Sequence, residues 1–210
     1  MGRTELYAIS AAVVLAGLLG STLWLSTRGP EDPFADCRES AVAGGIGSIG
    51  GPFTLIDEAG AQVTDQDVFT KPSLLYFGYT FCPDVCPLDN TRNAEAIDVL
   101  DSMGYDVKPV FISIDPERDR PEVLAEFTDY LHPEMLGLTG SPEQVKAASQ
   151  AYKTYYKKQD SDDDEYYLMD HSTFTYLVLP ETGFVEFFRR DVTPEDMAKR
   201  AACFIDKANK

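Results

Sequence analysis

The longest apolar run of the chain stands near its N-terminus. Residues 7–25 read YAISAAVVLAGLLGSTLWL, nineteen positions without a charged side chain. At a rise of about 1.5 Å per residue, a helix of this length just crosses the hydrocarbon core of a bilayer. We therefore expect one transmembrane anchor over residues 7–26, preceded by a cytoplasmic N-terminus at residues 1–6.

The charges that flank the apolar run set its expected orientation. Arg3 precedes the run and Arg28 follows it, so the asymmetry is small. The positive-inside tendency still favours a cytoplasmic N-terminus. A cleaved signal peptide is the alternative, but its apolar run is normally shorter and followed by a small-x-small site. No Arg- and Ser-rich transit segment precedes the run, which predicts a single-pass protein of the bacterial inner membrane with its C-terminal domain in the periplasm.

After the apolar run, the sequence pattern is that of a linker followed by a folded domain. Residues 27–50 are rich in Gly and Pro and predict a linker, with a folded domain over residues 51–210. FTLIDEAGAQVTD, from residue 53, predicts two short strands around a turn at residues 58–60. The continuous apolar run SLLYFGY at residues 73–79 is typical of a buried central strand.

The second half of the domain alternates helices with apolar strands. We expect a helix from beside Cys86 to about Met103, and a buried strand at KPVFISID, residues 108–115. Further helices are expected at residues 121–131, from Ser141 to about Tyr156, and from Thr193 to about residue 208. TFTYLVL at 173–179 and FVEFFRR at 184–190 predict a hairpin around a turn at residues 180–183.

This order of elements predicts the fold class. A strand–helix–strand unit that ends in a hairpin and a covering helix is typical of an α/β, thioredoxin-like fold. The front hairpin and the middle of the chain add pieces to that arrangement. We therefore expect a thioredoxin-like fold with an extra N-terminal β-hairpin and a mid-chain insertion, preceded by the transmembrane helix.

The charge of the chain excludes one class of partner. Asp and Glu number 35 against 18 Lys and Arg, for a formal net charge of −17. Such a chain repels phosphates, so we expect no nucleic acid as a partner. The run DSDDDE at residues 160–165 predicts a solvated acidic loop, with a partner site as the alternative.

Two of the four cysteines stand where chemistry is expected. Cys82 and Cys86 follow the strand at 73–79, at the start of a helix whose dipole favours the thiolate form. Positions four apart share one face of a helical turn, so both sulfurs can meet one ion. Thiolates are soft ligands that favour Cu(I), zinc or iron–sulfur centres. The spacing alone leaves a metal site, a redox pair and two inert buried thiols open.

A third ligand is available from one of the two histidines. His171 stands in YYLMDHS, directly before a strand, where a thioredoxin-like sheet approaches the cysteine-bearing helix. Two thiolates and one imidazole satisfy Cu(I) in trigonal form, whereas structural zinc requires a fourth ligand. A lone histidine is also typical of a surface or hydrogen-bonded residue, and His132, at a helix end, is expected to be structural or simply exposed. Met169 is a weaker candidate for an auxiliary soft ligand.

Three strings of this sequence resemble the Sco/SenC family of copper proteins. They are GYTFCPDVCP at 78–87, SIDPERDRPE at 113–122 and DHSTFTYLVLPETG at 170–183, and the resemblance covers about residues 48–207. The resemblance implies a membrane anchor, a thioredoxin-like domain, and one copper ion per chain, as Cu(I) and also Cu(II). It implies that Cys82, Cys86 and His171 hold the ion. Asp115 and Pro116 match the DPERD segment, where we expect them to shape a loop.

The resemblance implies a metallochaperone that helps assemble the copper A centre of cytochrome c oxidase, rather than an enzyme with turnover. Its implied partners are the copper-site subunit of the oxidase, other periplasmic copper carriers, and the membrane. A thiol–disulfide reductase of the oxidase's copper-site cysteines is the alternative, and a redox sensor also stays open. The spacing CxxxC argues against the reductase, since the usual redox motif is CxxC. No proline stands between Pro142 and Pro180 to face the cysteines, as thioredoxin-type enzymes require.

The other two cysteines lie outside the family's motifs. The resemblance assigns no role to Cys37 or Cys203. An oxidising compartment favours a disulfide between them, which would connect the linker to the last helix. The sequence leaves two separate thiols equally open, because it does not show how close these positions come.

Overall fold

The computed structural model describes residues 2, 7, 15–22, 32–40, 45–161 and 166–209. The chain divides into two compact units, Met1–Ala35 and Asp36–Lys210. In the first unit residues 15–22 are helical, but most of the predicted anchor lies outside the described residues. Among the residues that are described, we find no helix with the length and apolar character that a membrane crossing needs. Most of the predicted acidic loop, residues 162–165, also lies outside them.

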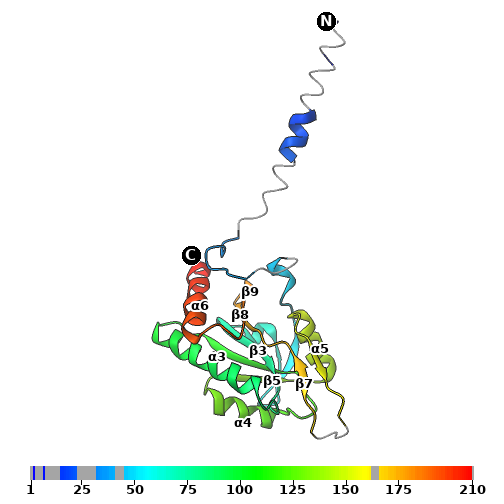
Figure 1. The fold of residues 1–210 in the computed structure, drawn as a ribbon, viewed down its shortest axis with the longest axis vertical. Helices are drawn as coiled ribbons and strands as arrows, with labels where there is room; N and C mark the ends of the chain where they lie inside the picture. The colour runs from blue at the N-terminus through cyan, green and yellow to red at the C-terminus, as the bar shows by residue number, and fades with distance from the viewer. Residues whose placement is uncertain are drawn as a thin grey trace. The chain divides into compact units, whose positions relative to one another are not determined.

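The second unit alternates strands with helices (Figure 1). Its strands are β1 (Thr54–Asp57), β2 (Gln62–Thr64), β3 (Ser73–Gly78), β4 (Lys108–Ser113), β5 (Leu136–Thr139), β6 (Tyr156–Lys158), β7 (Met169–His171), β8 (Thr175–Leu179) and β9 (Gly183–Phe188). Its helices are the 3-10 turn η1 (Ile46–Ser48) and the α-helices α2 (Asp65–Val68), α3 (Val85–Ser102), α4 (Pro121–Leu131), α5 (Pro142–Ala151) and α6 (Pro194–Ala208).

A seven-stranded mixed sheet forms the centre of the domain, in the order β2-β1-β5-β4-β3-β8-β9. β3 and β4 are parallel, as are β4 and β5, whereas β8 lies antiparallel to β3 and to β9. Helices α3, α4 and α6 lie on one side of this sheet and α5 on the other (Figure 1). The unit β3–α3–β4, followed by the β8–β9 hairpin and α6, is the predicted thioredoxin-like arrangement.

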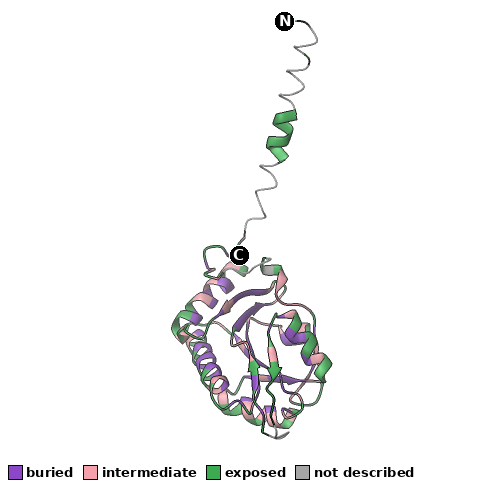
Figure 2. Cartoon of the chain, turned by 45° about the vertical axis from the view of Figure 1, so that its right-hand side comes forward, coloured by how far each residue is buried: buried purple, intermediate pink, exposed green. Residues whose placement is uncertain are grey.

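The core is built on the strands that the sequence marks as apolar throughout. Every residue of β3 and of β8 is buried, because helices cover both faces of these central strands. Figure 2 shows this burial along the middle strands and on the inner sides of the helices. The fully buried aromatic side chains Tyr76, Phe77 and Phe111 lie in this core. The strand that leads to the cysteines is therefore a fully buried strand at the centre of the sheet.

Several elements match the sequence prediction closely. The front hairpin turns at residues 58–60, where Gly60 adopts a φ of +79° that favours glycine. Helix α3 ends with Met103 as its C-cap, followed by Gly104 at a φ of +88°. Ser141 caps α5 in a capping box with Gln144, as its sequence pattern indicates.

Other predictions need correction. The helix expected to run to about Tyr156 ends at Ala151, because Lys153 takes a left-handed φ of +54° and Tyr156 pairs with His171 in a separate two-stranded sheet. The strand expected to reach Asp115 ends at Ser113, since the Asp115 carbonyl accepts hydrogen bonds that close a turn. Strand β5, helix α2 and the β6–β7 pair have no counterpart in the predicted elements.

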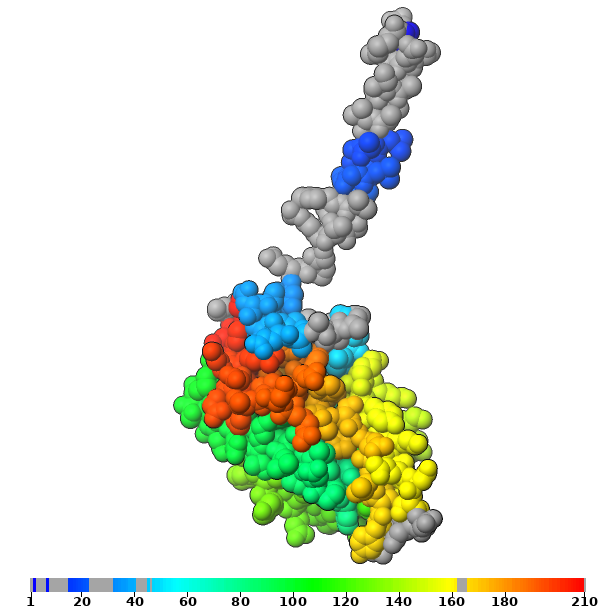
Figure 3. Space-filling view, viewed as in Figure 1, coloured from blue at the N-terminus to red at the C-terminus, as the bar shows by residue number. Residues whose placement is uncertain are grey.

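Residues 36–40, here called the N-terminal strap, pack against α6 and β9. The blue strap lies beside the red and orange atoms of α6 in Figure 3. Cys37 forms a disulfide with Cys203 of α6, with their Cα atoms 5.8 Å apart. The Arg38 guanidinium donates to the carbonyl of Val185 and lies over the Phe204 ring. The strap thus joins the edge of the sheet to the last helix.

Candidate metal centre

The chain enters the site from the end of β3. After Gly78, residues 79–84 form a short loop, and α3 begins at Val85, so Cys82 lies in the loop and Cys86 in the first helical turn. A Cβ atom on Gly78 would lie 3.0 Å from the Cys86 sulfur and 3.0 Å from the Phe111 ring. Glycine is therefore required here, because it lets the strand pass directly against the second thiol.

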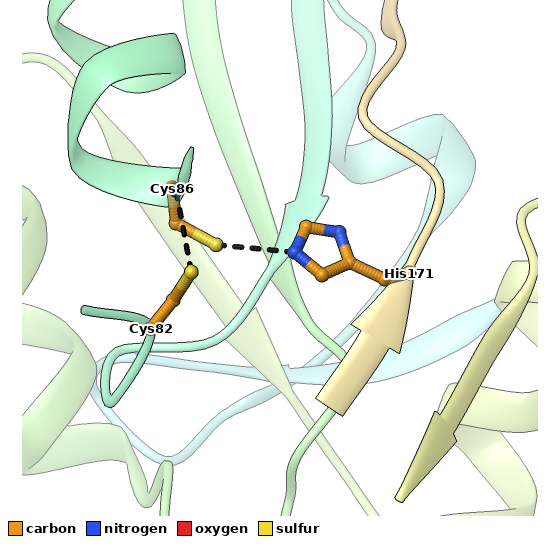
Figure 4. A group of neighbouring side chains, drawn as sticks. All are labelled: Cys82, Cys86 and His171. Atoms are coloured by element: carbon orange, nitrogen blue, oxygen red, sulfur yellow. Dashed lines mark hydrogen bonds between the residues drawn. The ribbon is translucent and has the colours of Figure 1, made fainter. Parts of the chain in front are cut away.

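The two thiols and the predicted histidine meet in the structure. Cys82 and Cys86 are free and buried, whereas His171 is partly exposed. The Cys86 backbone N–H donates to the Cys82 sulfur at 3.4 Å, and the Cys86 sulfur lies 3.4 Å from His171 Nε2 (Figure 4). One ligand atom from each residue lies within 4.8 Å of the others. The arrangement could hold one metal ion between two sulfurs and one nitrogen.

A hydrogen bond fixes which nitrogen of His171 faces the sulfurs. His171 Nδ1 lies 2.9 Å from the carbonyl oxygen of Ser172. Because a carbonyl only accepts, Nδ1 donates to Ser172, which leaves Nε2 as the ring nitrogen that faces the thiols. The rings of Tyr76 and Tyr79 lie edge-on to the imidazole, with their centroids 6.2 and 5.8 Å from its centroid. The ring is therefore held in the orientation that a metal ligand needs.

The two thiols affect each other's pKa in opposite directions. The hydrogen bond from Cys86 lowers the pKa of Cys82 to about 3, with further help from His171 and from backbone N–H groups at the helix start, while burial opposes it. The same bond to Cys82 raises the pKa of Cys86, and burial raises it further. Burial also raises the pKa of Tyr79 to about 12. At neutral pH the pair is thus a Cys82 thiolate beside a Cys86 thiol.

A buried carboxylate that the sequence analysis did not single out holds the cysteine loop. Asp119 is fully buried and accepts hydrogen bonds from the Thr80 N–H at 3.0 Å and the Thr80 hydroxyl at 2.6 Å. It also accepts from the Ser113 hydroxyl at 2.6 Å. Burial raises the pKa of Asp119 although these bonds oppose the shift. The string SIDPERDRPE contains Asp119, but nothing in the string shows that its partner is a residue near position 80.

Asp115 does more than shape its loop. Its backbone carbonyl accepts from the N–H groups of Arg118 and Asp119, which closes the turn after β4. Its carboxylate accepts from the Tyr167 hydroxyl at 2.7 Å and from Arg118 Nε at 2.6 Å. Asp115 therefore also connects this loop to the segment that leads to His171.

The remaining predicted residues take separate places. Met169 is buried, and its N–H donates to the Tyr79 hydroxyl at 3.2 Å, so its use as an auxiliary ligand stays a prediction. His132 is the C-cap of α4, with Nε2 3.6 Å from an Asp98 carboxylate oxygen. The disulfide between Cys37 and Cys203 leaves Cys82 and Cys86 as the free thiols of the chain.

Known proteins match this chain over most of its length. The model of the SCO1/SenC family matches residues 43–206. Protein SenC of Rhodobacter capsulatus is 52% identical over 204 residues, which cover 97% of this chain and 91% of that protein. The structure of Arabidopsis thaliana ScoI with copper bound has a TM-score of 0.71 and 41% identity, covering 75% of this chain and 99% of that one. The structure of Bradyrhizobium japonicum ScoI with copper bound has a TM-score of 0.67 and 38% identity, and the match covers 73% of this chain and 98% of that one. The family match spans more than half of the sequence, and this chain therefore belongs to the SCO1/SenC family.

Proposed function

We propose that this chain is a membrane-anchored copper chaperone that helps assemble the copper A centre of cytochrome c oxidase. The observation that carries the proposal is the convergence of Cys82, Cys86 and His171, whose ligand atoms lie within 4.8 Å of one another. The similar ScoI structures of two organisms are described with copper bound. Copper is here the cargo of the protein, which receives the ion and passes it on.

The donor set suits Cu(I) in particular. Two thiolates are soft ligands, and an imidazole completes the three-coordinate geometry that Cu(I) accepts. Cys82 is already a thiolate at neutral pH, since its pKa is lowered to about 3, so only Cys86 has to lose a proton. The bound ion then leaves a charge of −1 in a partly buried site. His171 is the partly exposed member of the set, which favours transfer of the ion on its side.

Copper titration of the reduced full-length protein in detergent tests the ligand set. We expect one Cu(I) per chain in competition with a chromophoric chelator. His171→Ala is expected to weaken Cu(I) binding by at least about tenfold, and Cys82→Ala or Cys86→Ala by more. His132→Ala is the matched control, because it removes the other histidine of the chain and should leave affinity unchanged. Equal affinity in His171→Ala and the parent would disprove the three-ligand site.

Transfer of the ion is a separate test. The Cu(I)-loaded protein is mixed with the reduced copper-site domain of the oxidase subunit, and the copper content of each protein is measured after separation. We expect copper to move to the acceptor, since its thiolates can displace the Cys82, Cys86 and His171 ligands one at a time. Retention of all copper on this chain would contradict a delivery role while leaving the binding site intact.

The lowered pKa of Cys82 also favours a second function, reduction of the oxidase's copper-site disulfide. A thiolate at neutral pH is the reactive form in thiol–disulfide exchange, although a very low pKa weakens its nucleophilicity. In this reaction Cys82 attacks the acceptor disulfide, Cys86 resolves the mixed disulfide, and the chain leaves oxidised. Rapid reduction of the oxidised acceptor by copper-free protein would favour this function over delivery.

The membrane anchor over residues 7–26 and the periplasmic location are parts of the same proposal. The apolar run supports the anchor, and the Cys37–Cys203 disulfide is of the kind that persists in an oxidising compartment. We expect the full chain to stay with membranes after alkaline extraction, and a variant that lacks residues 1–26 to be released. Protease added to spheroplasts should digest the domain, and its protection there would place the domain in the cytoplasm.

A further inference from the structure

His171 reaches the thiols from outside the sheet that carries them. Its strand, β7, pairs with β6 in a two-stranded sheet, whereas β3 and the cysteine loop extend from the seven-stranded sheet. The main sheet reaches this segment only at β8, where Thr175, four residues after His171, pairs with Tyr76 of β3. Contacts between the β7 segment and the cysteine loop therefore help to set the distance between His171 and the sulfurs.

Arg118 makes contacts of this kind to both segments. Its guanidinium carbon lies 3.5 Å from the centroid of the Tyr167 ring, four residues before His171. On the other segment it lies 4.7 Å from the centroid of Phe81, the residue before Cys82, and 5.7 Å from that of Tyr79. A planar guanidinium stacks well on aromatic faces. This guanidinium is largely buried and the Tyr167 and Tyr79 rings are buried, so their contacts are strengthened by the loss of water, whereas Phe81 is exposed.

Asp115 holds the guanidinium in this place. Arg118 Nε donates to the Asp115 carboxylate at 2.6 Å, and both side chains are largely buried. The other oxygen of Asp115 accepts from the Tyr167 hydroxyl at 2.7 Å. Arg118, Asp115 and Tyr167 therefore form a closed triangle in which each member contacts the other two. One corner of the triangle, Tyr167, belongs to the segment that carries the histidine.

We propose that Arg118 is a positioning residue of the copper site, which holds the His171 segment against the cysteine loop by packing on Tyr167 and Phe81. The inference rests on the proposed copper-binding function. Arg118 does not touch the ion. It acts through His171, so its removal lets the imidazole move away from the sulfurs and leaves the two thiolates in place.

A double-mutant cycle on the full-length protein tests this. We expect Arg118→Met to weaken Cu(I) binding by about tenfold, the effect typical of outer partners of metal ligands. In a His171→Ala background the same substitution should change affinity by less than about twofold, because the residue through which it acts is already gone. An equal loss in both backgrounds, or no loss in either, would overturn the inference.

Spectroscopy separates positioning from a general loss of stability. With Cu(II) bound, electron paramagnetic resonance should show one coordinated nitrogen in the parent and a mixture of sites with and without nitrogen in Arg118→Met. Arg189→Met is the matched control, since it removes a largely exposed arginine paired with Asp191 and should leave the spectrum unchanged. A parent-like spectrum in Arg118→Met would overturn the inference.

A second pair of variants keeps the test decisive if Arg118→Met does not fold. Tyr167→Ala removes the ring that Arg118 contacts and should reproduce the loss of nitrogen coordination. Tyr167→Phe keeps the ring and removes only the hydroxyl that bonds to Asp115, so it should retain most of the coordination. If both variants bind copper as the parent does, Arg118 does not position His171. If His171→Ala binds copper as tightly as the parent, the three-ligand site of the proposed function is disproved, independently of any result for Arg118.

Discussion

The two sulfurs of the cysteine pair differ in how readily they lose a proton. The neighbouring Cys86 lowers the pKa of Cys82 to about 3, while Cys82 and burial raise that of Cys86. A group with a depressed pKa is ionised at every pH above that value, so Cys82 is a thiolate across the physiological range. Cys86 is fully buried, which raises its pKa, so its proton has to leave when a metal binds.

The pH dependence of alkylation measures this arrangement. In reduced, metal-free protein we expect Cys82 to react with iodoacetamide at a rate that is nearly constant between about pH 5 and 8, because its thiolate fraction is constant there. In Cys86→Ala the donor is lost, so the rate at Cys82 should rise about tenfold per pH unit below its new pKa. Peptide mass spectrometry resolves the sites. A steep pH dependence in the parent would show that the pKa of Cys82 is not lowered.

Asp119 is the residue whose removal should loosen the cysteine loop most. Asp119→Ala leaves the Thr80 N–H and the Ser113 hydroxyl without their acceptor. We expect a loss of about 2–4 kcal/mol in the free energy of unfolding, since buried donors left unpaired cost about 1–3 kcal/mol each. Urea denaturation measures it. Thr80→Val, which removes one hydroxyl and keeps the N–H bond, should cost about half as much or less.

The elements that the sequence predicted are those whose signals are local. Ser141 and Thr193 cap α5 and α6 with hydrogen bonds to residues three positions later, so their pattern is visible in a short window. The β8–β9 hairpin shows its strands and its turn in one continuous stretch. The sequence did not predict β5 or the β6–β7 pair, because strands of three or four residues are too short to show a hydrophobic period. The partner of β5, strand β1, is also distant in the chain.

The same distinction applies to the site. Cys82 and Cys86 could be proposed as metal ligands from their spacing at a strand end. His171 could be distinguished from an ordinary surface histidine only by the family resemblance. Arg118 could not be assigned at all, because its partners Tyr167 and Phe81 are brought together only by the folded loops. A sequence pattern can indicate a metal ligand from the chemistry of its side chain. A residue that positions a ligand, such as Arg118, is recognised only from its contacts in the folded structure.

The strap and α6 depend on their disulfide. Cys37 and Cys203 are separated by 166 residues, so the bond restricts the unfolded chain strongly. We expect Cys37→Ser/Cys203→Ser to lose about 2–5 kcal/mol of unfolding free energy. Lys207→Ala, which removes the ion pair between Lys207 and the exposed Asp36 at the same place, should cost far less than loss of the disulfide. Equal urea midpoints for the double variant and the parent would show that the disulfide adds no stability.

At the scale of the whole molecule, the copper site joins side chains from two different sheets. The cysteines belong to the β3–α3 junction and His171 to the β6–β7 sheet. The contacts between them are hydrogen bonds and aromatic packing around Tyr79, Asp115 and Tyr167. An ion bound to all three ligands adds a direct link between these two sheets, so its effect should extend to global stability.

Copper-linked stabilisation is therefore expected, and it should depend on all three ligands. An ion that binds the folded chain alone stabilises it by about 2.7 kcal/mol at a free concentration 100 times its Kd. For a domain of this size we expect the Tm to rise by about 5–10 °C. The rise should disappear in Cys82→Ala/Cys86→Ala, which lacks both sulfurs, and shrink in His171→Ala, which keeps the thiolates but loses the link to β7. Calorimetry measures the Tm. Keeping the Cys37–Cys203 disulfide intact in every variant ensures that a change in Tm comes from copper and not from the disulfide. If His171→Ala were stabilised as much as the parent, copper would be held by the cysteine loop alone, and the β6–β7 sheet would have no part in binding.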